Sequence, residues 1–522
     1  MLDQGVLDQV GVHTGATTYV CALLVRPGAD GVTALAAALA SEGAVAALNP
    51  ALTLTELADA LNRLRPAVIA VEASTRALAT EALMLARSSG STPAPTPMLD
   101  CSTVVEFCAP GEGPIAVHSP PLSSQQSRPA QQVPADRKLI IWTSGTTGTP
   151  RAIALRGEGV LEAAQAQTKR LAVEPGASMV TSLPLAPVGG LMIPIRAGLA
   201  QGVVEAVPAF DAEALIQLGQ AGRADHISLV PVMLQRLVDA LEERGAAAAP
   251  AMAPHEAPAQ APHPAPRFGT LLIGGAACPQ PLVARAQQAG LKLALTWGMT
   301  ESAAQAATAL PADVAADAAS VGPSLDHVEV RATPEGRMML RLAALDPAEL
   351  KPADVDSADV DAAELVSLTD PDGWFVTGDL GFVADDGRIF ITGRAADRII
   401  TGGFNVDPGE VERVLLEHKG VADAVVVGLP DEEWGEKVCA AIVPAAGTHP
   451  TTLLTELDPW VRPRLTSAKR PRRWAFVDAI PRTAADKVDR AAVRAVFSGG
   501  HPLSGSQPFA SNQRQAEVDH ES

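Results

Sequence analysis

A short loop rich in glycine and hydroxyl side chains follows an apolar run and could hold phosphate groups. The run is residues 139–142, Leu-Ile-Ile-Trp, whose composition is typical of a strand that crosses a buried sheet. The loop contains Thr143, Ser144, Gly145, Thr146, Thr147 and Gly148, and Arg151 follows it. Glycines let backbone amides approach a polyanion, while hydroxyl groups and the guanidinium add donors. No Gly-Lys-Ser/Thr sequence closes the loop, so it is not a Walker loop.

Five further segments contain residue types that suit nucleotide and metal binding. They are residues 274–278 (GGAAC), 296–302 (TWGMTES), 373–381 (GWFVTGDLG), 387–412 (GRIFITGRAADRIITGGFNVDPGEVE) and 481–490 (PRTAADKVDR). Glu301 offers a hard carboxylate oxygen suited to Mg²⁺, and Asp379 is a short acceptor held on a turn. Taken singly, these acids are more typical of surface positions, and Arg394 and Lys487 of solvated cations.

Together with the loop, the five segments occur in the order found in one family. Over roughly residues 30–495 the chain resembles the adenylate-forming superfamily of acyl-CoA synthetases, carrier-loading adenylation domains and luciferases. The resemblance implies an α/β fold, with a large layered N-terminal domain at 1–393, a small mobile α+β domain at 394–495, and a disordered tail at 496–522. It also implies ATP, Mg²⁺ and coenzyme A (CoA) as ligands. In the implied reaction a carboxylate attacks the α-phosphate of ATP to give acyl-AMP and pyrophosphate, and a thiol then displaces AMP.

The resemblance assigns roles to individual residues. It implies nucleotide contacts at the loop residues, Arg151, Gly274, Gly275, Ala276, Trp297, Gly298, Met299, Thr300, Asp379, Arg394 and Lys487. It implies that Thr143 and Glu301 hold the metal ion, that Asp379 binds the ribose hydroxyls, and that the Trp297 ring lies against the adenine. The implied catalytic residues are Glu301, Arg394 and Lys487. For Lys487 the physical reason is that an ammonium group can neutralise the negative charge that builds on the α-phosphate. Gly402, Gly403 and Asn405 match the segment that lines the family's pantetheine tunnel.

Four segments indicate which acid is activated. Residues 182–202, 210–215, 226–238 and 320–325 look like those of 2-succinylbenzoate:CoA ligases of menaquinone biosynthesis. The likeness implies that Arg196 meets the free carboxylate of the succinyl arm, with Gly189 and Gly190 also at the acid site. The arginine alone is as typical of a helix surface. Other fatty or aromatic acyl-CoA synthetases, and an adenylation enzyme that loads a carrier protein, stay open as alternatives.

The chain departs from the family pattern at several positions. Arg151 replaces the phosphate-loop lysine, and Pro187 replaces the histidine that lines the acyl channel. Ala396 stands at the hinge with Asp397 beside it, and Asp486 replaces the glycine before Lys487. By this resemblance the N-terminus looks truncated, and we expect the family's opening helix and strand to be missing from it. A degenerate member that binds a nucleotide without turnover is therefore a further alternative.

Composition limits the class of protein. The 522 residues, 47% of them hydrophobic, can form more than one domain with a large core. A net charge of -19 argues against nucleic acid as the main partner, and no membrane span is expected. Five unpatterned cysteines and the lack of a leader segment predict a cytoplasmic protein, with a homodimer as a possible assembly.

Pattern along the chain predicts several elements. Residues 67–71 and 424–429 are expected as strands, and 408–418 as an amphipathic helix. Segments rich in small, polar or acidic residues at 117–136, 245–266 and 346–364 are expected as flexible loops.

Overall fold

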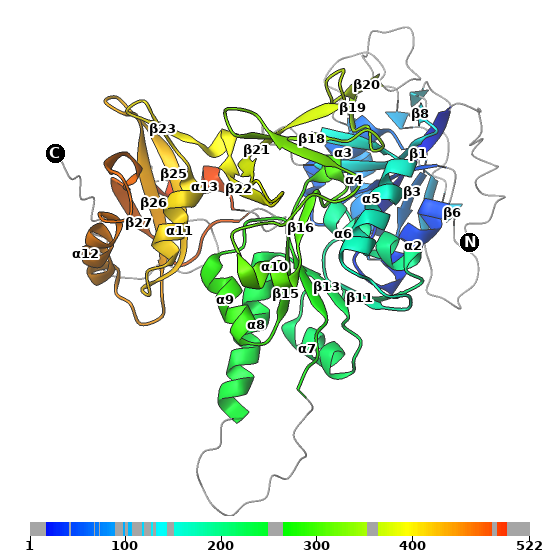
Figure 1. Ribbon diagram of the computed structural model, residues 1–522. Coiled ribbons are helices and arrows are strands. Elements are labelled where there is room, and N and C mark those ends of the chain that lie inside the picture. The colour runs from blue at the N-terminus through cyan, green and yellow to red at the C-terminus, as the bar shows by residue number, and fades with distance from the viewer. Residues whose placement is uncertain are drawn as a thin grey trace, which may run out of the picture.

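The protein is described by a computed structural model, shown in Figure 1. The described residues are 17–40, 43–66, 68–72, 74–88, 98–99, 103–106, 117–118, 127–128, 132–143, 151–248, 265–351, 364–482 and 488–497. Six predicted site residues lie outside them, namely Ser144, Gly145, Thr146, Thr147, Gly148 and Lys487, as does Asp486. The fold is α/β, as predicted, with a large N-terminal part and a smaller C-terminal part.

The first sheet has ten strands and forms the N-terminal part of the molecule. Its order is β20-β19-β10-β9-β2-β1-β3-β5-β6, with β8 paired to β1. The strands are β1 (Thr17–Leu24), β2 (Ala44–Ala47), β3 (Val68–Val71), β5 (Thr103–Glu106), β6 (Val117–His118), β8 (Gln132–Pro134), β9 (Arg137–Thr143), β10 (Arg151–Arg156), β19 (Ala348–Lys351) and β20 (Glu364–Ser367). Leu139, Ile140 and Ile141 of β9 are fully buried, which confirms the expected interior strand.

The second sheet is mainly parallel and carries the next set of crossover helices. Its order is β12-β11-β13-β14-β15-β16, and only β16 runs antiparallel to its neighbour. The strands are β11 (Ser178–Thr181), β12 (Val203–Ala206), β13 (His226–Leu229), β14 (Thr270–Ile273), β15 (Lys292–Trp297) and β16 (Ala307–Ala309). Parallel neighbours need crossover connections. In this sheet they are the helices α6 (Val188–Leu199), α7 (Ala212–Gln220), α8 (Pro231–Ala248) and α9 (Gln280–Gln288).

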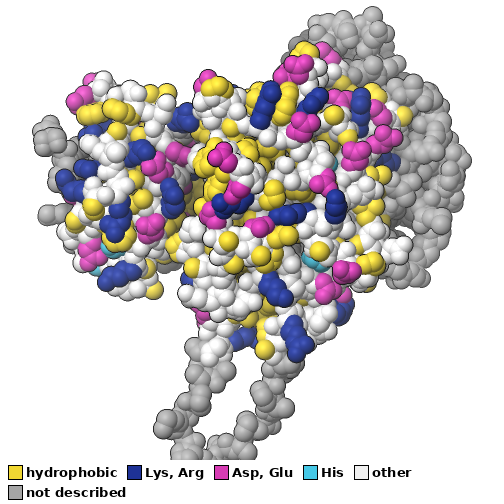
Figure 2. Space-filling model, viewed as in Figure 1, with side chains coloured by type: hydrophobic (Ala, Val, Ile, Leu, Met, Phe, Trp, Pro, Cys, Tyr) yellow, Lys and Arg dark blue, Asp and Glu magenta, His cyan; other side chains and the backbone are white. Residues whose placement is uncertain are grey.

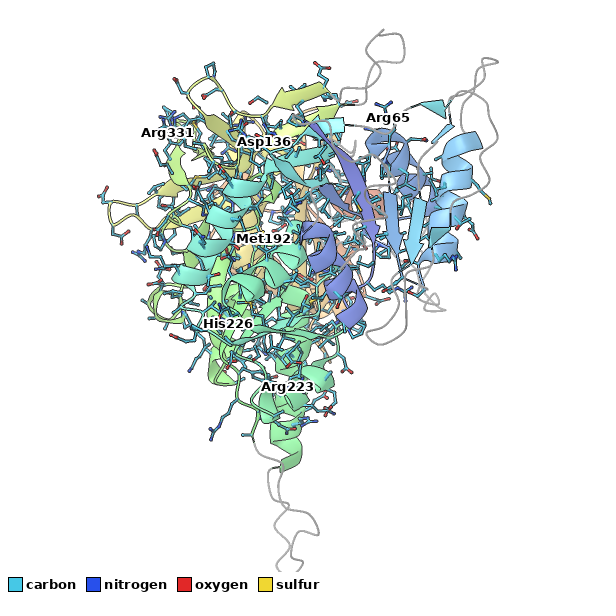
Figure 3. All side chains as sticks on the ribbon, turned by 90° about the vertical axis from the view of Figure 1, so that its right-hand side faces the viewer. Arg65, Asp136, Met192, Arg223, His226 and Arg331 are labelled. Atoms are coloured by element: carbon cyan, nitrogen blue, oxygen red, sulfur yellow. The ribbon has the colours of Figure 1, made fainter. Side chains whose placement is uncertain are left out.

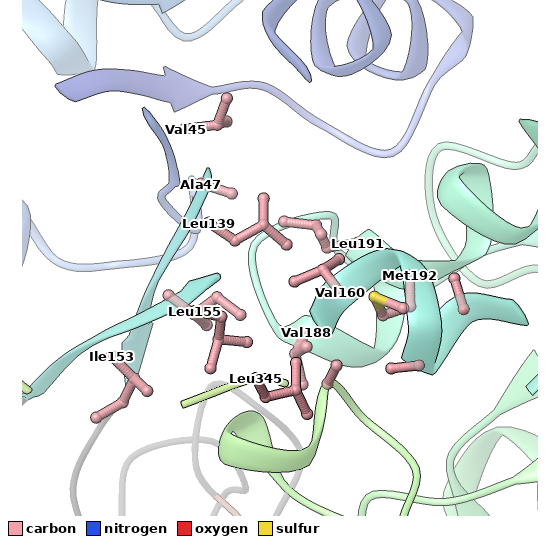
Figure 4. Packing of buried hydrophobic residues seen from close by; sticks show 14 of the residues in the cluster. Val45, Ala47, Leu139, Ile153, Leu155, Val160, Val188, Leu191, Met192 and Leu345 are labelled. Atoms are coloured by element: carbon pink, nitrogen blue, oxygen red, sulfur yellow. The ribbon is translucent and has the colours of Figure 1, made fainter. Parts of the chain in front are cut away.

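The helices of the N-terminal part cover these two sheets (Figure 1). They are α2 (Ala29–Ala40), α3 (Leu54–Leu64), α4 (Arg76–Ser88), α5 (Gly157–Arg170), α6 (Val188–Leu199), α7 (Ala212–Gln220), α8 (Pro231–Ala248), α9 (Gln280–Gln288), α10 (Pro311–Ala316) and the short 3-10 helix η1 (Thr300–Ser302). Leu139, Leu155, Val160, Leu191 and Met192 meet where α5 and α6 pack on the first sheet (Figure 4). That packing fixes α5 and α6 relative to β9 and β10.

Two further sheets follow along the chain. The third, in the order β17-β18-β21-β22, is antiparallel, and the fourth has the order β24-β23-β26-β25 with β27 paired to β26. The third contains β17 (Glu329–Ala332), β18 (Arg337–Arg341), β21 (Trp374–Val383) and β22 (Ile389–Arg394). The fourth contains β23 (Ile399–Thr401), β24 (Phe404–Val406), β25 (Val421–Asp431), β26 (Gly435–Pro444) and β27 (Arg473–Phe476). The helices that accompany them are η2 (Ala395–Asp397), α11 (Pro408–Leu416), α12 (Pro450–Val461), η3 (Ser467–Lys469) and α13 (Arg490–Phe497).

The predicted helix and strands of the C-terminal part are present. Helix α11 begins at Pro408, and the Asp407 side chain accepts a hydrogen bond from the Gly409 N–H at its first turn. Strand β25 contains the predicted residues 424–429 and extends beyond them at both ends, because its pairing with β26 runs from Val421 to Asp431. The predicted strand at 67–71 is β3 over its described residues.

Short strands occur inside two segments that the sequence predicts as loops. Within 117–136 the structure has β6, β7 (Ser127–Arg128) and β8, and within 346–364 it has β19. Strand β4 (Met98–Leu99) pairs with β7. These strands pair with neighbours in the first sheet, β8 with β1 and β19 with β10. They are short, and only alternate residues of β19, Ala348 and Leu350, are buried, so each offers too few apolar positions to stand out in the sequence. Residues 249–264 and 352–363 lie outside the described residues, and so does 498–522 of the predicted tail.

Candidate functional site

Two neighbouring parallel strands deliver glycine-rich turns to the same edge of the second sheet. Ile273 of β14 pairs in register with Leu295 of β15, so Gly274 to Ala276 and Trp297 to Thr300 leave the sheet side by side. A side chain at Gly298 could not be accommodated, because its Cβ would lie 2.2 Å from the Ala304 carbonyl oxygen. Ligands of α/β sheets bind beyond the carboxyl ends of parallel strands, which is where both turns lie.

The Asp379 carboxylate joins this edge to the third sheet. Asp379 is buried, and its Oδ2 accepts a hydrogen bond from Trp297 Nε1 at 2.8 Å. Its Oδ1 lies 3.1 Å from Arg394 Nε, and the two residues are paired across β21 and β22. The carboxylate is therefore held in one orientation by two donors from different strands, while the half-exposed Arg394 side chain reaches toward solvent. A preoriented acceptor of this kind suits a pair of vicinal hydroxyl groups.

Glu301 lies in the same electrostatic environment. It is the second residue of η1, which packs against β10. Burial raises the pKa of Glu301, and the charges of Arg151 and Arg394 oppose that rise while Asp379 adds to it. Glu301, Asp379, Arg151 and Arg394 thus lie within electrostatic range of one another, on four different elements. The charges of the two carboxylates and the two guanidinium groups balance, and the side chains of Arg151 and Arg394 are partly exposed.

Arg151 has a partner that the sequence did not indicate. Its Nε and Nη2 both contact Oε2 of Glu349 on β19, at 3.0 and 2.8 Å, and Lys351 Nζ contacts Oε1 at 2.7 Å. Thr143 lies opposite Arg151 in the β9–β10 pairing, with its hydroxyl donating to the Arg151 carbonyl oxygen at 3.3 Å. The strands on either side of the glycine-rich loop are therefore held together, and Glu349 holds the guanidinium from one edge.

Arg196 is a buried cation with no carboxylate partner among the described residues. It is 3% exposed, on α6. Its Nη1 donates to Gln167 Oε1 at 3.0 Å and its Nη2 to Ser228 Oγ at 3.4 Å, while its buried Nε has no hydrogen-bond partner. Burial lowers the pKa of Arg196 to about 10. An unpaired buried guanidinium is costly, so this position favours an anion supplied by a ligand.

His226 lies near this guanidinium at the start of β13, two residues before Ser228 on the same strand. Burial first, and then the charge of Arg196, lower the pKa of His226, and its buried Nδ1 has no hydrogen-bond partner. In the view of Figure 3, His226 lies below Met192 of α6. The charge of the neighbouring Asp225 acts in the opposite direction and raises the pKa of His226. The Asp225 carboxylate accepts from the Ser178 N–H and hydroxyl group, whereas the hydrogen bonds given for Arg196 go to Gln167 and Ser228.

Other predicted site residues lie elsewhere. Gly189 and Gly190 form the first turn of α6, after Pro187 at its N-cap, so they precede Arg196 on one helix. Gly402, Gly403 and Asn405 lie at the β23–β24 hairpin of the fourth sheet, where the Gly402 N–H donates to the Trp434 carbonyl oxygen at 2.8 Å. At the predicted hinge, Ala396 lies in η2.

The neighbouring Asp397 also lies in η2, and its Oδ2 is 3.1 Å from Nε of Arg490, the first residue of α13. Arg490 also contacts Glu412 of α11 at 3.0 Å. The segment that follows Arg394 is thus tied to the helices of the C-terminal part.

Sequence reasoning missed Glu349, Gln167, Ser228 and His226. The alternation His-Ile-Ser-Leu in residues 226–229 places two polar side chains on one face of a buried strand, which is a signal that could have been used. Gln167 stands in an alanine-rich helix and Glu349 in an acidic run, and neither shows such a pattern. Their importance depends on contacts with distant segments.

A magnesium ion would find few protein ligands here. Among the described residues, no group of three or more His, Cys, Asp or Glu side chains could hold a metal ion by itself. Mg²⁺ commonly binds through one or two carboxylates together with substrate phosphates, and Glu301 supplies one such carboxylate beside the glycine-rich turns. The donor set fits an ion that arrives with a polyphosphate.

Replacing Asp379 with asparagine is expected to weaken nucleotide binding about ten- to a hundredfold, because a charged acceptor of hydrogen bonds is lost and Arg394 loses its partner. The dissociation constant of ATP·Mg²⁺, measured by calorimetry, checks this. Asp386→Asn is the matched control, since Asp386 also pairs with an arginine, Arg388, at the β21–β22 turn. An unchanged ATP affinity in Asp379→Asn would exclude the carboxylate from the nucleotide site.

Comparison with known proteins matches both parts of the chain to enzyme families. A family model described as AMP-binding enzyme matches residues 5–337, and one described as AMP-binding enzyme C-terminal domain matches residues 410–487. The 2-succinylbenzoate–CoA ligase of Geobacillus sp. (strain WCH70) is 30% identical over 357 residues, which cover 68% of each chain. The protein of the same name from Listeria monocytogenes is 30% identical over 351 residues, covering 67% of this chain and 68% of its own.

Solved structures share the fold. The o-succinylbenzoate CoA synthetase MenE from Bacillus subtilis, in complex with an acyl-adenylate intermediate, matches with a TM-score of 0.69 at 22% identity, covering 94% of this chain and 90% of its own. The amide bond synthetase McbA from Marinactinospora thermotolerans matches with a TM-score of 0.73 at 26% identity, covering 94% and 92%. None of the described helices is long and apolar enough to cross a membrane.

Proposed function

The chain belongs to the family of AMP-binding enzymes, and from this premise we propose that it is an AMP-forming acid–CoA ligase whose substrate acid carries a second carboxylate. The leading substrate is 2-succinylbenzoate, which would place the enzyme in menaquinone biosynthesis. The observation that carries the choice of acid is Arg196, a buried guanidinium that has no acid partner among the described residues. A diacid keeps one free carboxylate after the other is activated, and that group would neutralise Arg196. In this proposal the carboxylate of the succinyl arm is activated and the ring carboxylate binds Arg196, in place of the sequence expectation that Arg196 meets the succinyl arm.

The residues of the candidate site would act on bound ATP as follows. Asp379 would hold the ribose hydroxyls, oriented by Trp297 and Arg394. Arg151, held on one edge by Glu349, would present its remaining N–H groups to the phosphates beside the glycine-rich loop. Glu301 and Thr143 would hold Mg²⁺, which supplies charge neutralisation on the polyphosphate when bound.

In the first half-reaction, a carboxylate oxygen of the acid would form a bond to the α-phosphorus while the bond to pyrophosphate breaks. Lys487, which lies outside the described residues, is proposed to neutralise the charge that grows on the α-phosphate. In the second, the CoA sulfur would bond to the acyl carbon, AMP would leave, and the thiol proton would pass to solvent. Gly402, Gly403 and Asn405 would line the thiol's path, which requires the C-terminal part to move between the two steps.

Release of pyrophosphate across a panel of acids tests the proposal. Purified protein with ATP and Mg²⁺ is expected to release pyrophosphate with 2-succinylbenzoate, and to form a thioester only when CoA is added. Release with a different acid would keep the reaction and discard the substrate. No release with any acid, from folded protein that binds ATP, would instead support a degenerate nucleotide-binding member.

The same test must also establish which molecule accepts the acyl group, because the similar protein McbA is named as an amide bond synthetase. The reaction is therefore run with CoA, with a pantetheine-bearing carrier protein, and with a simple amine. A thioester formed with CoA at the lowest acceptor concentration would support the ligase, while preference for the carrier protein or the amine would replace CoA with that acceptor.

A further inference from the structure

The amide group of Gln167 connects two parts of the candidate site. Gln167 lies on α5 and is completely buried. Its Nε2 donates to the Ala303 carbonyl oxygen at 2.7 Å, and its Oε1 accepts from Arg196 Nη1 at 3.0 Å. One end of a short side chain therefore contacts the cation proposed to bind the acid. The other end contacts the turn that carries Glu301, two residues before Ala303.

Only one orientation of this amide satisfies both neighbours. A guanidinium has N–H donors and no acceptor, while a carbonyl oxygen accepts and cannot donate. Rotating the amide by 180° would place its NH₂ group against the N–H groups of Arg196 and its oxygen against the Ala303 oxygen. Both contacts would become repulsive, so Gln167 must present its oxygen to Arg196 and its nitrogen to the turn.

The turn that Gln167 holds has a strained backbone. Ala303 and Ala304 have φ values of 50° and 83°, in the left-handed region that residues with a side chain rarely adopt. Two backbone hydrogen bonds help to hold them, from Ala304 N–H to the Met299 oxygen at 3.0 Å and from Ala306 N–H to the Trp297 oxygen at 2.7 Å. The bond from Gln167 is a side-chain restraint on this conformation, beside the Ser302 hydroxyl group, which bonds to the Met299 backbone, and His327 Nε2, which lies 3.4 Å from the Ser302 oxygen. Glu301 lies within the same turn, two residues before Ala303.

At its other end, Gln167 contacts a cation whose hydrogen bonds are incomplete. Arg196 Nε has no partner, and the contact to Ser228 is long at 3.4 Å. A carboxylate that binds Arg196 would compete for its N–H groups and fix its position. A shift in the position of Arg196 would therefore alter its hydrogen bond to the Gln167 oxygen. Because the amide is rigid, the same shift would alter the hydrogen bond from Gln167 Nε2 to the Ala303 carbonyl oxygen.

From these contacts we propose that Gln167 is a positioning residue that couples the acid subsite at Arg196 to the turn carrying Glu301, so that a dicarboxylic acid and ATP·Mg²⁺ each strengthen binding of the other. The inference rests on the proposed function, because it takes Arg196 as the acid anchor. Coupling between two sites is reciprocal, and typical couplings change affinity about five- to 150-fold. An enzyme built in this way commits ATP to reaction when the correct acid is present.

The test measures nucleotide binding with and without acid, apart from turnover. The full chain is titrated by calorimetry with α,β-methylene-ATP and Mg²⁺, which cannot release pyrophosphate. The titration is repeated with saturating 2-succinylbenzoate and with 4-oxo-4-phenylbutanoate, which has the same framework without the ring carboxylate. In the native protein, 2-succinylbenzoate is expected to tighten nucleotide binding about fivefold or more, and the monoacid to have a smaller effect.

Two substitutions separate the contacts of Gln167. Gln167→Met keeps the volume and removes both hydrogen bonds, so the tightening by 2-succinylbenzoate is expected to fall below about twofold. Gln167→Glu still accepts from Arg196 but cannot donate to Ala303 when ionised, and it supplies Arg196 with an internal anion. It is expected to lose the coupling and also to weaken binding of the diacid more than that of the monoacid.

Gln165→Met is the matched control, because Gln165 is an exposed glutamine on the same helix. It is expected to retain the native coupling. Thermal unfolding of each variant confirms that it is folded under the conditions of the titration. Native-like coupling in folded Gln167→Met, or a native protein that binds both ligands without any coupling, would overturn the inference.

The outcomes also separate this inference from the proposed function. Coupled binding without pyrophosphate release from ATP would discard the ligase activity and leave the role of Gln167 standing. Pyrophosphate release without coupled binding would support the ligase activity and discard the coupling role of Gln167. Failure of the native protein to bind either ligand would overturn both.

Discussion

Replacing Lys487 with alanine is expected to slow acyl-AMP formation by about two to three orders of magnitude, the loss typical when one group that stabilises transition-state charge is removed. Thioester formation from supplied acyl-AMP and CoA should change much less, because no new bond forms to the α-phosphate in that step. Single-turnover pyrophosphate release measures the first half-reaction, and thioester formation from synthetic acyl-AMP measures the second. The contrast between the two rates is the diagnostic quantity.

Lys419→Ala is the control for this experiment, since Lys419 is an exposed lysine of the C-terminal part. It should leave both half-reactions unchanged. An equal loss in both half-reactions of Lys487→Ala would contradict the proposed division of labour and would point to a general disturbance of the C-terminal part.

Replacing Arg196 with methionine is expected to raise the KM for 2-succinylbenzoate about ten- to a hundredfold, which corresponds to the loss of a charged hydrogen-bonded contact. The KM for 4-oxo-4-phenylbutanoate should change much less, because that acid has no second carboxylate to bind. Methionine fills much of the space of the arginine stem, so packing against α5 and β13 is largely retained. Steady-state pyrophosphate release with each acid gives the two KM values.

Stability provides a second measurement on the same variant. Arg196 is a buried charge without a described acid partner, so its removal should leave the midpoint of thermal unfolding unchanged or raise it. Arg236→Met is the control, because Arg236 is exposed on α8. Equal increases of KM for the diacid and the monoacid would exclude Arg196 as the anchor and return it to a structural role.

The chain departs from the family pattern at Arg151, and its surroundings explain how the change can be accommodated. Glu349 binds the Nε and Nη2 edge of the guanidinium and leaves Nη1 outside that contact. The planar guanidinium has N–H donors on separate edges, so an acid can bind one edge while another edge faces a ligand. A lysine ammonium group is a compact point charge and has no separate edges of this kind. Positive and negative side chains are mixed over the face shown in Figure 2, with no large area of one charge.

The sequence by itself determined the fold class and the family, because the motifs that identify them are local. An apolar strand next to a glycine-rich loop, and a helix that begins at Asp407 and Pro408, each follow from a few adjacent residues whose backbone preferences act within one or two turns of chain. The candidate roles of Glu301 and Asp379 follow from the family resemblance, which depends on the order of the short motifs that contain them.

Only the tertiary structure decided which of these residues are charged neighbours and what holds them. Trp297 and Asp379 lie 82 positions apart in the chain, yet one hydrogen bond joins them, and Gln167 meets Ala303 from 136 positions away. The sequence left Arg196 open between a helix surface and a binding site, because burial depends on the packing of α5, α6 and β13 against one another. Burial and pairing set the electrostatic energy of a charge, and both are properties of the packed elements rather than of any one segment.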